Sequence, residues 1–327
     1  MLLYSFDPHR YTKNSRDLCD ILEKEDKLKM GDLADNFLKQ IMDEEKKFYD
    51  HIVAIQSPSG NGKSFFLALL YCKILKKEID NPVNYINILD YISDDNAQNC
   101  IDIIEDKRDR KSKTSVVLID NLDKHSPKFI YEFIHLLHKL TSKENFLFIV
   151  AYDYDLLLTK LSKYLAGGEQ EIERYLQSHI HLDYLLGMQD LEINSIISLP
   201  FVPVENVQKT IVDIIKSGYA TGAFSVKQIV IIIAKLEIYI AKNKPESIKE
   251  VYLAFKLIAI KLLCKKIYVS LFAGKGLDYD NCADEKAKKH IIEIDEIVSK
   301  NTGTSNNGIE GDSEISENTV IKKMEIS

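Results

Sequence analysis

A short loop rich in glycine and serine constrains the fold of this chain more than any other segment. It reads Ser57-Pro-Ser-Gly-Asn-Gly-Lys-Ser64, follows the apolar run 51–56 and precedes a helical pattern over 63–76. A strand, such a loop and a helix start in this order bring backbone N–H groups to one point, where they bind phosphate. The loop therefore predicts an α/β domain with an anion site at a strand–helix junction.

Each loop residue has an expected role if the ligand is a nucleoside triphosphate with magnesium. Gly62 leaves room for the β-phosphate to touch the main chain, Lys63 reaches the β- and γ-phosphates, and the Ser64 hydroxyl binds Mg²⁺. Ser57 replaces the first glycine of the usual GxxxxGK[ST] pattern, a position that begins the loop without lining the phosphates. The expected cofactor-binding residues are Ser57, Pro58, Ser59, Gly60, Asn61, Gly62, Lys63, Ser64 and Phe65.

A second motif downstream is the natural partner of this loop. Val116-Val-Leu-Ile-Asp120 is an apolar run that ends in a carboxylate. A buried parallel strand delivers Asp120 to the sheet edge beside the loop, where it holds Mg²⁺ through water. We therefore expect Ser64 and Asp120 to be the metal-binding residues. Since the strand-like run 83–89 falls between the two motifs, we expect another strand to separate their strands, as in the additional-strand P-loop NTPases.

Strand-like runs alternate with helical patterns through the first two thirds of the chain. This alternation predicts the fold class: an α/β, three-layer P-loop NTPase core with a mostly parallel sheet, and a C-terminal all-helical domain. Strand-like runs span 51–56, 83–89, 115–120, 146–152 and 193–199, and helical patterns span 126–140, 204–219, 225–243, 245–272 and 284–300. The predicted divisions are 1–45, a helical lead-in; 46–203, the core; 204–275, a helical lid; and 276–327, a charged helix and disordered tail.

Composition narrows the choice of partners. The net charge of −7 argues against a strongly basic nucleic-acid binder. No arginine follows Arg174, so any mechanism that needs an arginine guanidinium from the C-terminal half of the chain is excluded. Lysines interrupt the apolar run 251–272, and the N-terminus has no signal-peptide pattern, so we expect no membrane span and a cytoplasmic location. The cysteines are scattered without a CxxC and are expected to be buried free thiols: Cys19, Cys72, Cys100, Cys264 and Cys282.

The segment Ile119-Asp-Asn-Leu-Asp-Lys-His-Ser-Pro127 resembles the KAP family of P-loop NTPases, in which this strand typically ends in DDLDR before a Ser/Pro helix start. The resemblance extends over about residues 26–260, and it implies an ATP- and Mg²⁺-dependent ATPase. The chain is similar to the soluble branch of this family, because no membrane span interrupts the predicted core. Further family-like segments lie at 26–37, 148–153, 196–201 and 243–249.

Departures from the family pattern bear on hydrolysis. Asn121 stands where the family has a second acid, and an amide cannot take the proton of an attacking water. Asp123 remains as a polarising carboxylate, and Lys124 replaces an arginine. The expected catalytic residues are Lys63, Asp120, Asp123 and Asp153.

Other departures concern the lid and weaker signals. Ser195 replaces a lysine before the family's Ile-Ile run. Glu246 stands where an arginine could reach the γ-phosphate, so the lid does not sense the γ-phosphate by that route.

Asp153, at a strand end, is either a γ-phosphate sensor or a turn cap. His135 and His138 lie three residues apart, but no Asp, Glu or Cys completes a metal set. The basic run 107–113 is a solvated loop or a contact for nucleic acid or acidic partners.

The sequence thus favours an ATP-binding switch with weak or impaired hydrolysis, in bacterial phage defence or signalling as the family resemblance implies. Its partners are expected to be the nucleotide and either a second copy or another protein. A scaffold that binds nucleotide without hydrolysis is the first alternative. The second is an AAA+-like DNA-associated ATPase, which the acidic composition disfavours. No guanine-reading Asn-Lys-x-Asp motif occurs, which favours adenine.

Overall fold

A computed structural model describes residues 15–41, 51–76, 83–91, 96–106, 115–141, 146–165, 169–180, 182–186, 194, 196–273, 276–302, 320 and 323. The chain divides into two compact units, Met1–Leu191 and Glu192–Ser327. The finer division predicted above stays a prediction. The basic run 107–113, Ser195 and nearly all of the predicted tail lie outside the described residues.

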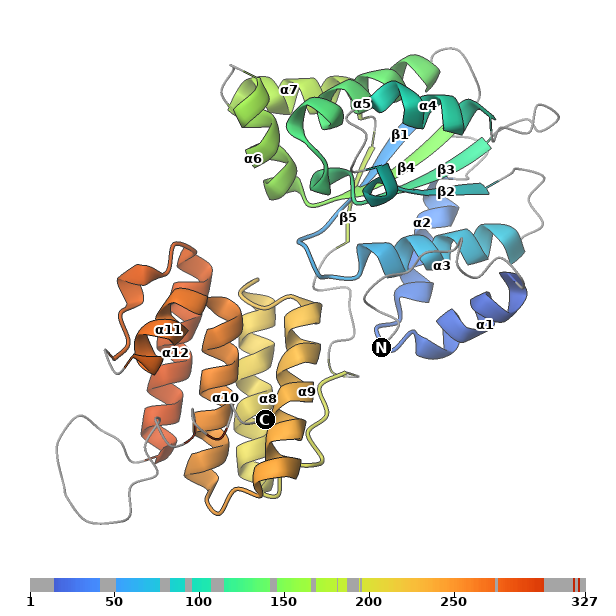
Figure 1. Ribbon diagram of the computed structural model, residues 1–327. Helices are drawn as coiled ribbons and strands as arrows, with labels where there is room; N and C mark the ends of the chain where they lie inside the picture. The colour runs from blue at the N-terminus through green and yellow to red at the C-terminus, as the bar shows by residue number, and fades with distance from the viewer. Residues whose placement is uncertain are drawn as a thin grey trace. The chain divides into compact units, whose positions relative to one another are not determined.

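The first unit is built on a five-stranded sheet of parallel strands (Figure 1). Its strands are β1 (His51–Gln56), β2 (Val83–Asn87), β3 (Ser115–Asp120), β4 (Phe146–Tyr152) and β5 (Leu182–Leu185), in the order β2-β3-β4-β1-β5. One strand separates β1 from β3, which confirms the additional-strand fold. The separating strand is β4, whereas the run expected from its place in the sequence forms the edge strand β2. The reason is composition: β4 is apolar and buried throughout, as a central parallel strand must be, whereas β2 contains Asn84 and Asn87.

The strand predicted over 193–199 is wrong in its described part, since residues 196–200 form turns and irregular backbone. Leu199 is fully buried there without pairing in the sheet. The edge beside β1 is occupied instead by β5, in which Leu182 pairs with Val53 and Leu185 with Gln56.

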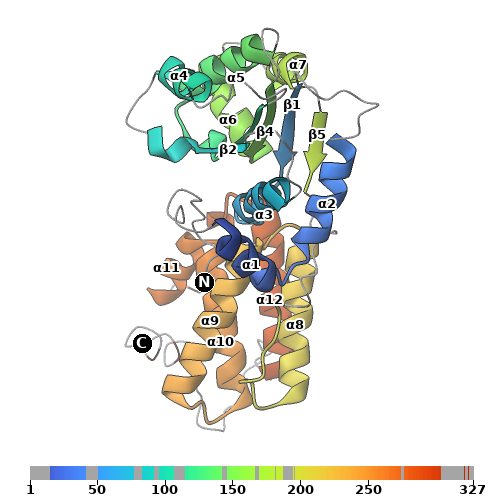
Figure 2. The same cartoon turned by 90° about the vertical axis from the view of Figure 1, so that its right-hand side faces the viewer.

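Helices cover both faces of the sheet, which gives the expected three layers (Figures 1 and 2). One face carries α4 (Ala97–Asp106), α5 (Pro127–Thr141), α6 (Tyr154–Tyr164) and α7 (Glu169–His179). The other carries α3 (Lys63–Lys76), with α1 (Ser15–Glu25) and α2 (Met30–Ile41) packed against it. The helix α5 begins within one residue of the helical pattern predicted from position 126, and the Ser126 hydroxyl accepts a hydrogen bond from the Phe129 N–H at 3.2 Å.

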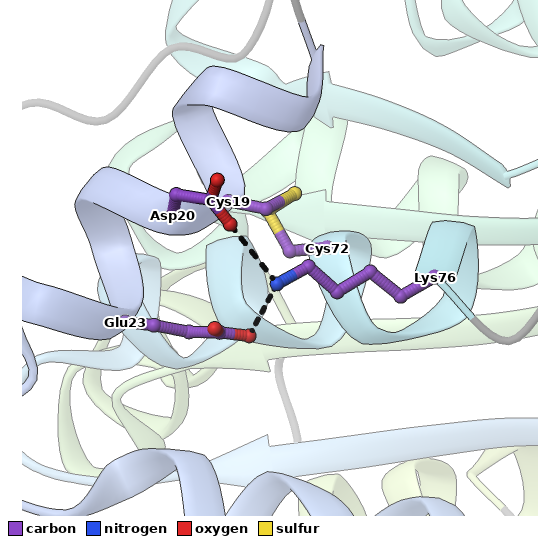
Figure 3. Close-up of a disulfide and its surroundings, with 5 residues drawn as sticks. All are labelled: Cys19, Asp20, Glu23, Cys72 and Lys76. Carbon is purple, nitrogen blue, oxygen red and sulfur yellow. Dashed lines mark hydrogen bonds and ion pairs between the residues drawn. A yellow bond between two sulfur atoms is a disulfide. The ribbon is translucent and has the colours of Figure 1, made fainter.

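A disulfide between Cys19 and Cys72 joins α1 to α3 (Figure 3). The expectation of free thiols is therefore wrong for this pair. The packing of the two helices brings the Cα atoms to 5.3 Å, within the range that a disulfide spans. The ammonium of Lys76 lies 2.9 Å from Glu23 and 3.4 Å from Asp20, so an ion-pair cluster supports the same contact. In the described part of the chain, Cys100, Cys264 and Cys282 form no disulfide and are buried, as expected.

The second unit is helical in all of its described regular structure. It contains α8 (Glu205–Ala220), α9 (Val226–Asn243), α10 (Ile248–Leu263), α11 (Lys265–Phe272), the short η7 (Tyr279–Asn281) and α12 (Glu285–Thr302). Ser225 and Gln228 form a capping box at the start of α9. The single helix predicted over 245–272 is divided in two, because the backbone is extended at Cys264.

The helix α10 lies at the centre of this unit. Its residues from Glu250 to Ile260 are all buried. A helix that is buried on every side carries apolar side chains all round, which explains the long apolar run in its sequence. None of the helices in the described ranges is long and apolar enough to cross a membrane.

Candidate functional site

The glycine- and serine-rich loop connects β1 to α3, and its backbone depends on two glycines. Gly60 has φ 91° and Gly62 has φ 86°, in the left-handed region that glycine adopts at little cost. The helix starts at once, with the Phe66 N–H bonded to the Gly62 carbonyl at 2.9 Å. Phe65 is buried, so its contribution to a ligand would come from its main chain.

Gly62 also packs against a residue that sequence reasoning missed. A Cβ atom at Gly62 would lie 2.6 Å from the Met30 Cε atom. Met30 is fully buried at the start of α2, where the Asp26 carboxylate accepts hydrogen bonds from the N–H groups of Met30 (2.9 Å) and Gly31 (2.6 Å). The family-like segment 26–37 therefore packs against the phosphate loop through Met30.

The Lys63 ammonium lies against its own loop. It donates to the carbonyl oxygens of Ser57 at 2.6 Å and Pro58 at 3.1 Å. Burial lowers the pKa of Lys63, whereas the nearby carboxylates of Asp123 and Asp153 raise it. The cation is thus partly desolvated and surrounded by charge of both signs.

Asp120 and Ser64, the two predicted metal ligands, lie close enough that the Ser64 hydroxyl lowers the pKa of the Asp120 carboxylate. The Asp120 carboxylate is 2% exposed, and it accepts from the Tyr85 hydroxyl and the Asn121 N–H, each at 2.8 Å. Burial raises the pKa of Asp120, and these hydrogen bonds lower it. Tyr85 comes from the edge strand β2, and no motif in the sequence indicated its role.

The backbone turns sharply after Asp120. Asn121 has φ 62°, a left-handed conformation that asparagine tolerates better than most residues. Its side-chain amide donates to the Asn87 Oδ1 atom at 3.1 Å. The turn leads into the short helix η4 (Leu122–Lys124), which buries Asp123.

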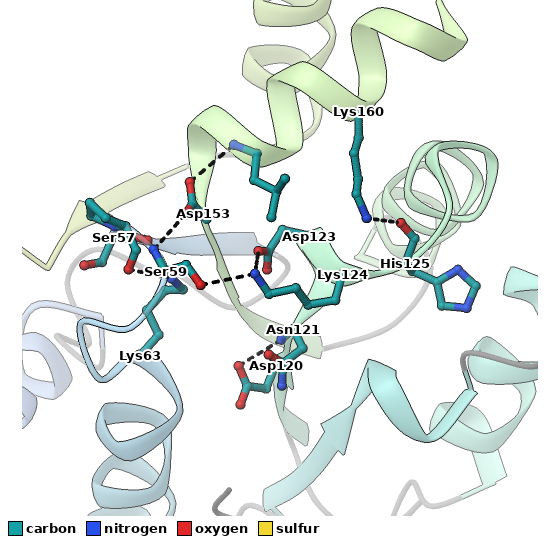
Figure 4. A network of polar contacts seen from close by, with 12 residues as sticks. Ser57, Ser59, Lys63, Asp120, Asn121, Asp123, Lys124, His125, Asp153 and Lys160 are labelled. Atoms are coloured by element: carbon teal, nitrogen blue, oxygen red, sulfur yellow. Dashed lines mark hydrogen bonds and ion pairs between the residues drawn. The ribbon is translucent and has the colours of Figure 1, made fainter. Parts of the chain in front are cut away.

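A polar network joins this turn to the phosphate loop (Figure 4). The Lys124 ammonium lies 2.9 Å from the Asp123 carboxylate and donates to the Ser59 hydroxyl at 3.2 Å. The Asp153 carboxylate accepts from the Ser59 N–H at 2.7 Å and from the Leu156 N–H at 3.3 Å. Asp153 therefore caps α6 and also holds the loop. All four residues expected to be catalytic lie in or beside this network.

Lys160, on α6, was not indicated by any motif. Its ammonium donates to the His125 carbonyl at 2.7 Å. Burial lowers the pKa of Lys160, and the Asp123 carboxylate opposes this shift. Asp123 thus interacts with three cations, those of Lys63, Lys124 and Lys160.

Glu246 belongs to the second unit. There its N–H group donates to the Glu250 carboxylate at 3.3 Å. Glu246 also lines a cavity of about 150 Å³ together with Val204 and Ser247.

In the first unit, His135 Nδ1 lies 3.5 Å from His179 Nε2, and His138 packs against the ring of His179. Across the described ranges, no three His, Cys, Asp or Glu side chains are arranged to hold a metal ion.

The fold and the site define a P-loop NTPase domain. The model of the KAP family P-loop domain matches residues 75–192, a range that lies within the part of the chain whose motifs resemble this family. The matched range begins after the phosphate loop and includes Asp120, Asn121, Asp123 and Asp153. No curated protein matches the sequence.

Solved structures give looser similarities. Domain III of the replication initiation protein DnaA from Thermotoga maritima has a TM-score of 0.40 and 17% identity, covering 73% of this chain and 92% of its own. A single-substitution variant of RuvB from Thermotoga maritima has a TM-score of 0.37 and 15% identity, covering 83% and 82%. AMPPCP-bound DnaA from Aquifex aeolicus has a TM-score of 0.37 and 11% identity, covering 89% and 85%. Because these scores are low, the fold assignment rests on the strand order and the helix layers.

Proposed function

We propose that this chain binds Mg²⁺-ATP at residues 57–65 and works as a conformational switch whose hydrolysis is slow or absent. The observation that carries the proposal is the closeness of the Ser64 hydroxyl to the buried Asp120 carboxylate at the start of α3. A hydroxyl and a carboxylate at this point are oxygen ligands that Mg²⁺ prefers. A divalent cation there would also favour the ionised form of the buried Asp120, whose pKa burial raises.

The loop supports phosphate binding by its backbone and its cation. The left-handed Gly60 and Gly62 turn the main chain toward the helix start, where N–H groups and the helix dipole attract anions. A bound triphosphate would compete with the Ser57 and Pro58 carbonyl groups for the Lys63 ammonium. Exchanging two neutral carbonyl acceptors for phosphate charge is electrostatically favourable.

Slow hydrolysis follows from the engagement of the carboxylates near the loop. Asp123 forms an ion pair with Lys124, and Asp153 holds the Ser59 N–H and the start of α6. Asn121 cannot act as a base, and its amide is bonded to Asn87. We therefore propose that charge neutralisation and positioning are retained whereas proton abstraction is impaired. The limiting case is the scaffold that binds nucleotide without turning it over.

The test measures phosphate release and thermal stability of the same protein in Mg²⁺-ATP. We expect ATP to raise the melting temperature and phosphate release to be slow, with both effects lost in Lys63→Ala. Lys76→Ala, at the far end of α3, is the matched control and should keep both. An unchanged melting temperature in ATP would refute nucleotide binding, and fast release would refute impaired hydrolysis.

The biological setting is a further part of the proposal. Phage defence or signalling is implied by the family resemblance. The proposal also includes a cytoplasmic location and association with a second copy or a protein partner. A preference for ATP over GTP is supported by the lack of an Asn-Lys-x-Asp motif.

A further inference from the structure

The helical unit contains a buried carboxylate that needs a cation. Glu250, in the first turn of α10, is 0% exposed. Its carboxylate accepts hydrogen bonds from the Tyr239 hydroxyl at 2.7 Å and from the Glu246 N–H at 3.3 Å. Neither donor carries a charge, and an ionised carboxylate in such a place is costly unless a positive group offsets it.

The cation comes from the far C-terminus of the chain. The Lys323 ammonium lies 2.7 Å from the Glu250 carboxylate. Val320, three residues earlier, is 0% exposed, and both residues have helical backbone. One described residue of this segment is therefore buried, and another pairs with a buried carboxylate.

The pairing keeps Glu250 charged. Burial alone would raise the pKa of Glu250, but the hydrogen bonds from Lys323 and Tyr239 and the charge of Lys323 hold it below its ordinary value. Tyr239 responds in the opposite direction, since burial and the Glu250 carboxylate raise its pKa. The negative charge of the Glu250 carboxylate is therefore balanced by a lysine ammonium, and without that lysine it would be a buried charge with no positive group beside it among the described residues.

We propose that the helical unit has a peptide-binding site centred on Glu250, which recognises a lysine placed three residues after a buried apolar side chain. Its resident ligand is the chain's own C-terminal segment, held by Val320 and Lys323. This segment is covalently tethered to α12 through residues 303–319, so it binds in cis at a high effective concentration and excludes the same peptide in trans.

The test uses the full chain and a labelled synthetic peptide of residues 314–327. Lys323→Gln in the full chain removes the tethered cation without altering the site, so this variant should bind the wild-type peptide in a fluorescence anisotropy titration. The wild-type chain, whose site is occupied in cis, should bind the peptide at least about tenfold more weakly. A peptide carrying Lys323→Gln should also bind the variant chain at least about tenfold more weakly, since a charged hydrogen bond is lost.

A peptide with Lys322→Gln is the matched control, because it loses the same charge one position away and should bind like the wild-type peptide. Equal binding of the two substituted peptides, or no binding of the wild-type peptide to the Lys323→Gln chain, would overturn the proposal. Hydrogen exchange on the full chains provides a second readout. The amides of Val320 and Lys323 should be protected in the wild-type and Lys322→Gln chains, and protection should fall at least about tenfold in Lys323→Gln. Equal protection in all three chains would also overturn it.

Discussion

The carboxylate of Asp153 and the backbone N–H of Ser59 form a 2.7 Å hydrogen bond that joins the end of β4 to the phosphate loop. The same carboxylate caps α6 through the Leu156 N–H. Asp153→Ala should therefore lower the free energy of unfolding by about 1–2 kcal/mol, the usual cost of losing a helix cap. Asp155→Ala, on the exposed first turn of the same helix, is the control. Equal effects of the two substitutions in urea denaturation would contradict this role.

Asn121→Asp tests whether a missing acid limits hydrolysis. The substitution supplies a proton acceptor at the turn after Asp120, so phosphate release should rise by about tenfold or more. It also replaces the amide that donates to Asn87, so some loss of stability is expected. Asn121→Ala loses the same amide without gaining an acid and should not release phosphate faster. An unchanged rate in Asn121→Asp would mean that the base lies elsewhere.

Gly62→Ala tests the packing of Met30 beneath the loop. Alanine at this position has a left-handed backbone that costs roughly 1–2 kcal/mol, and its Cβ atom would overlap Met30. The double variant Gly62→Ala/Met30→Ala removes the overlap but keeps the backbone cost. A double-mutant cycle in urea should therefore show that Gly62→Ala is less destabilising when residue 30 is alanine. Additive effects would show that Met30 does not restrict Gly62.

The histidines of α5 should make stability fall in mild acid. Burial, Lys139 and the neighbouring histidines lower the pKa of His135, and burial and His179 lower that of His138. The folded state therefore binds fewer protons than the unfolded state, whose histidines titrate near pH 6.5. Stability is fully present above that value and decreases as the pH falls through it toward the folded pKa values. His135→Gln/His138→Gln should flatten the pH dependence of urea unfolding between about pH 7.5 and 5, and an unchanged slope would contradict this.

The Cys19–Cys72 disulfide should stabilise the first unit under oxidising conditions. Its two cysteines are 53 positions apart, and closing a loop of this size stabilises a protein by typically about 2–4 kcal/mol. Cys19→Ser should lower the melting temperature of the oxidised protein to that of the reduced protein. The control, Cys100→Ser, changes a free cysteine and should leave the response to reductant intact. A melting temperature that does not respond to reductant would argue against the bond.

The parts of the fold that were predictable from sequence are those in which local pattern and burial agree. β1, β3 and β4 are continuous apolar runs that end in turns or carboxylates, as central parallel strands do. The same signal failed at 193–199, because Leu199 is buried without pairing and an apolar run cannot distinguish these cases. β5 was missed because four residues are too few for a pattern.

The site shows the same limit. The phosphate loop and Asp120 are local motifs, so their positions follow from the order of strand, loop and helix. Tyr85, Lys160 and Met30 reach the site from other elements, and the Cys19–Cys72 bond joins helices far apart in the sequence. Such contacts depend on tertiary packing, which no local pattern encodes.

We propose that the main chain around Lys63 binds a nucleoside triphosphate with magnesium. Isothermal titration calorimetry of the purified chain with Mg²⁺-ATP tests it most directly. The wild-type chain and Lys76→Ala should give saturable heat. Lys63→Ala should bind at least about tenfold more weakly, because it loses a charged hydrogen-bond donor. No heat from the folded wild-type chain with Mg²⁺-ATP or Mg²⁺-GTP, or equal affinity in Lys63→Ala, would contradict it.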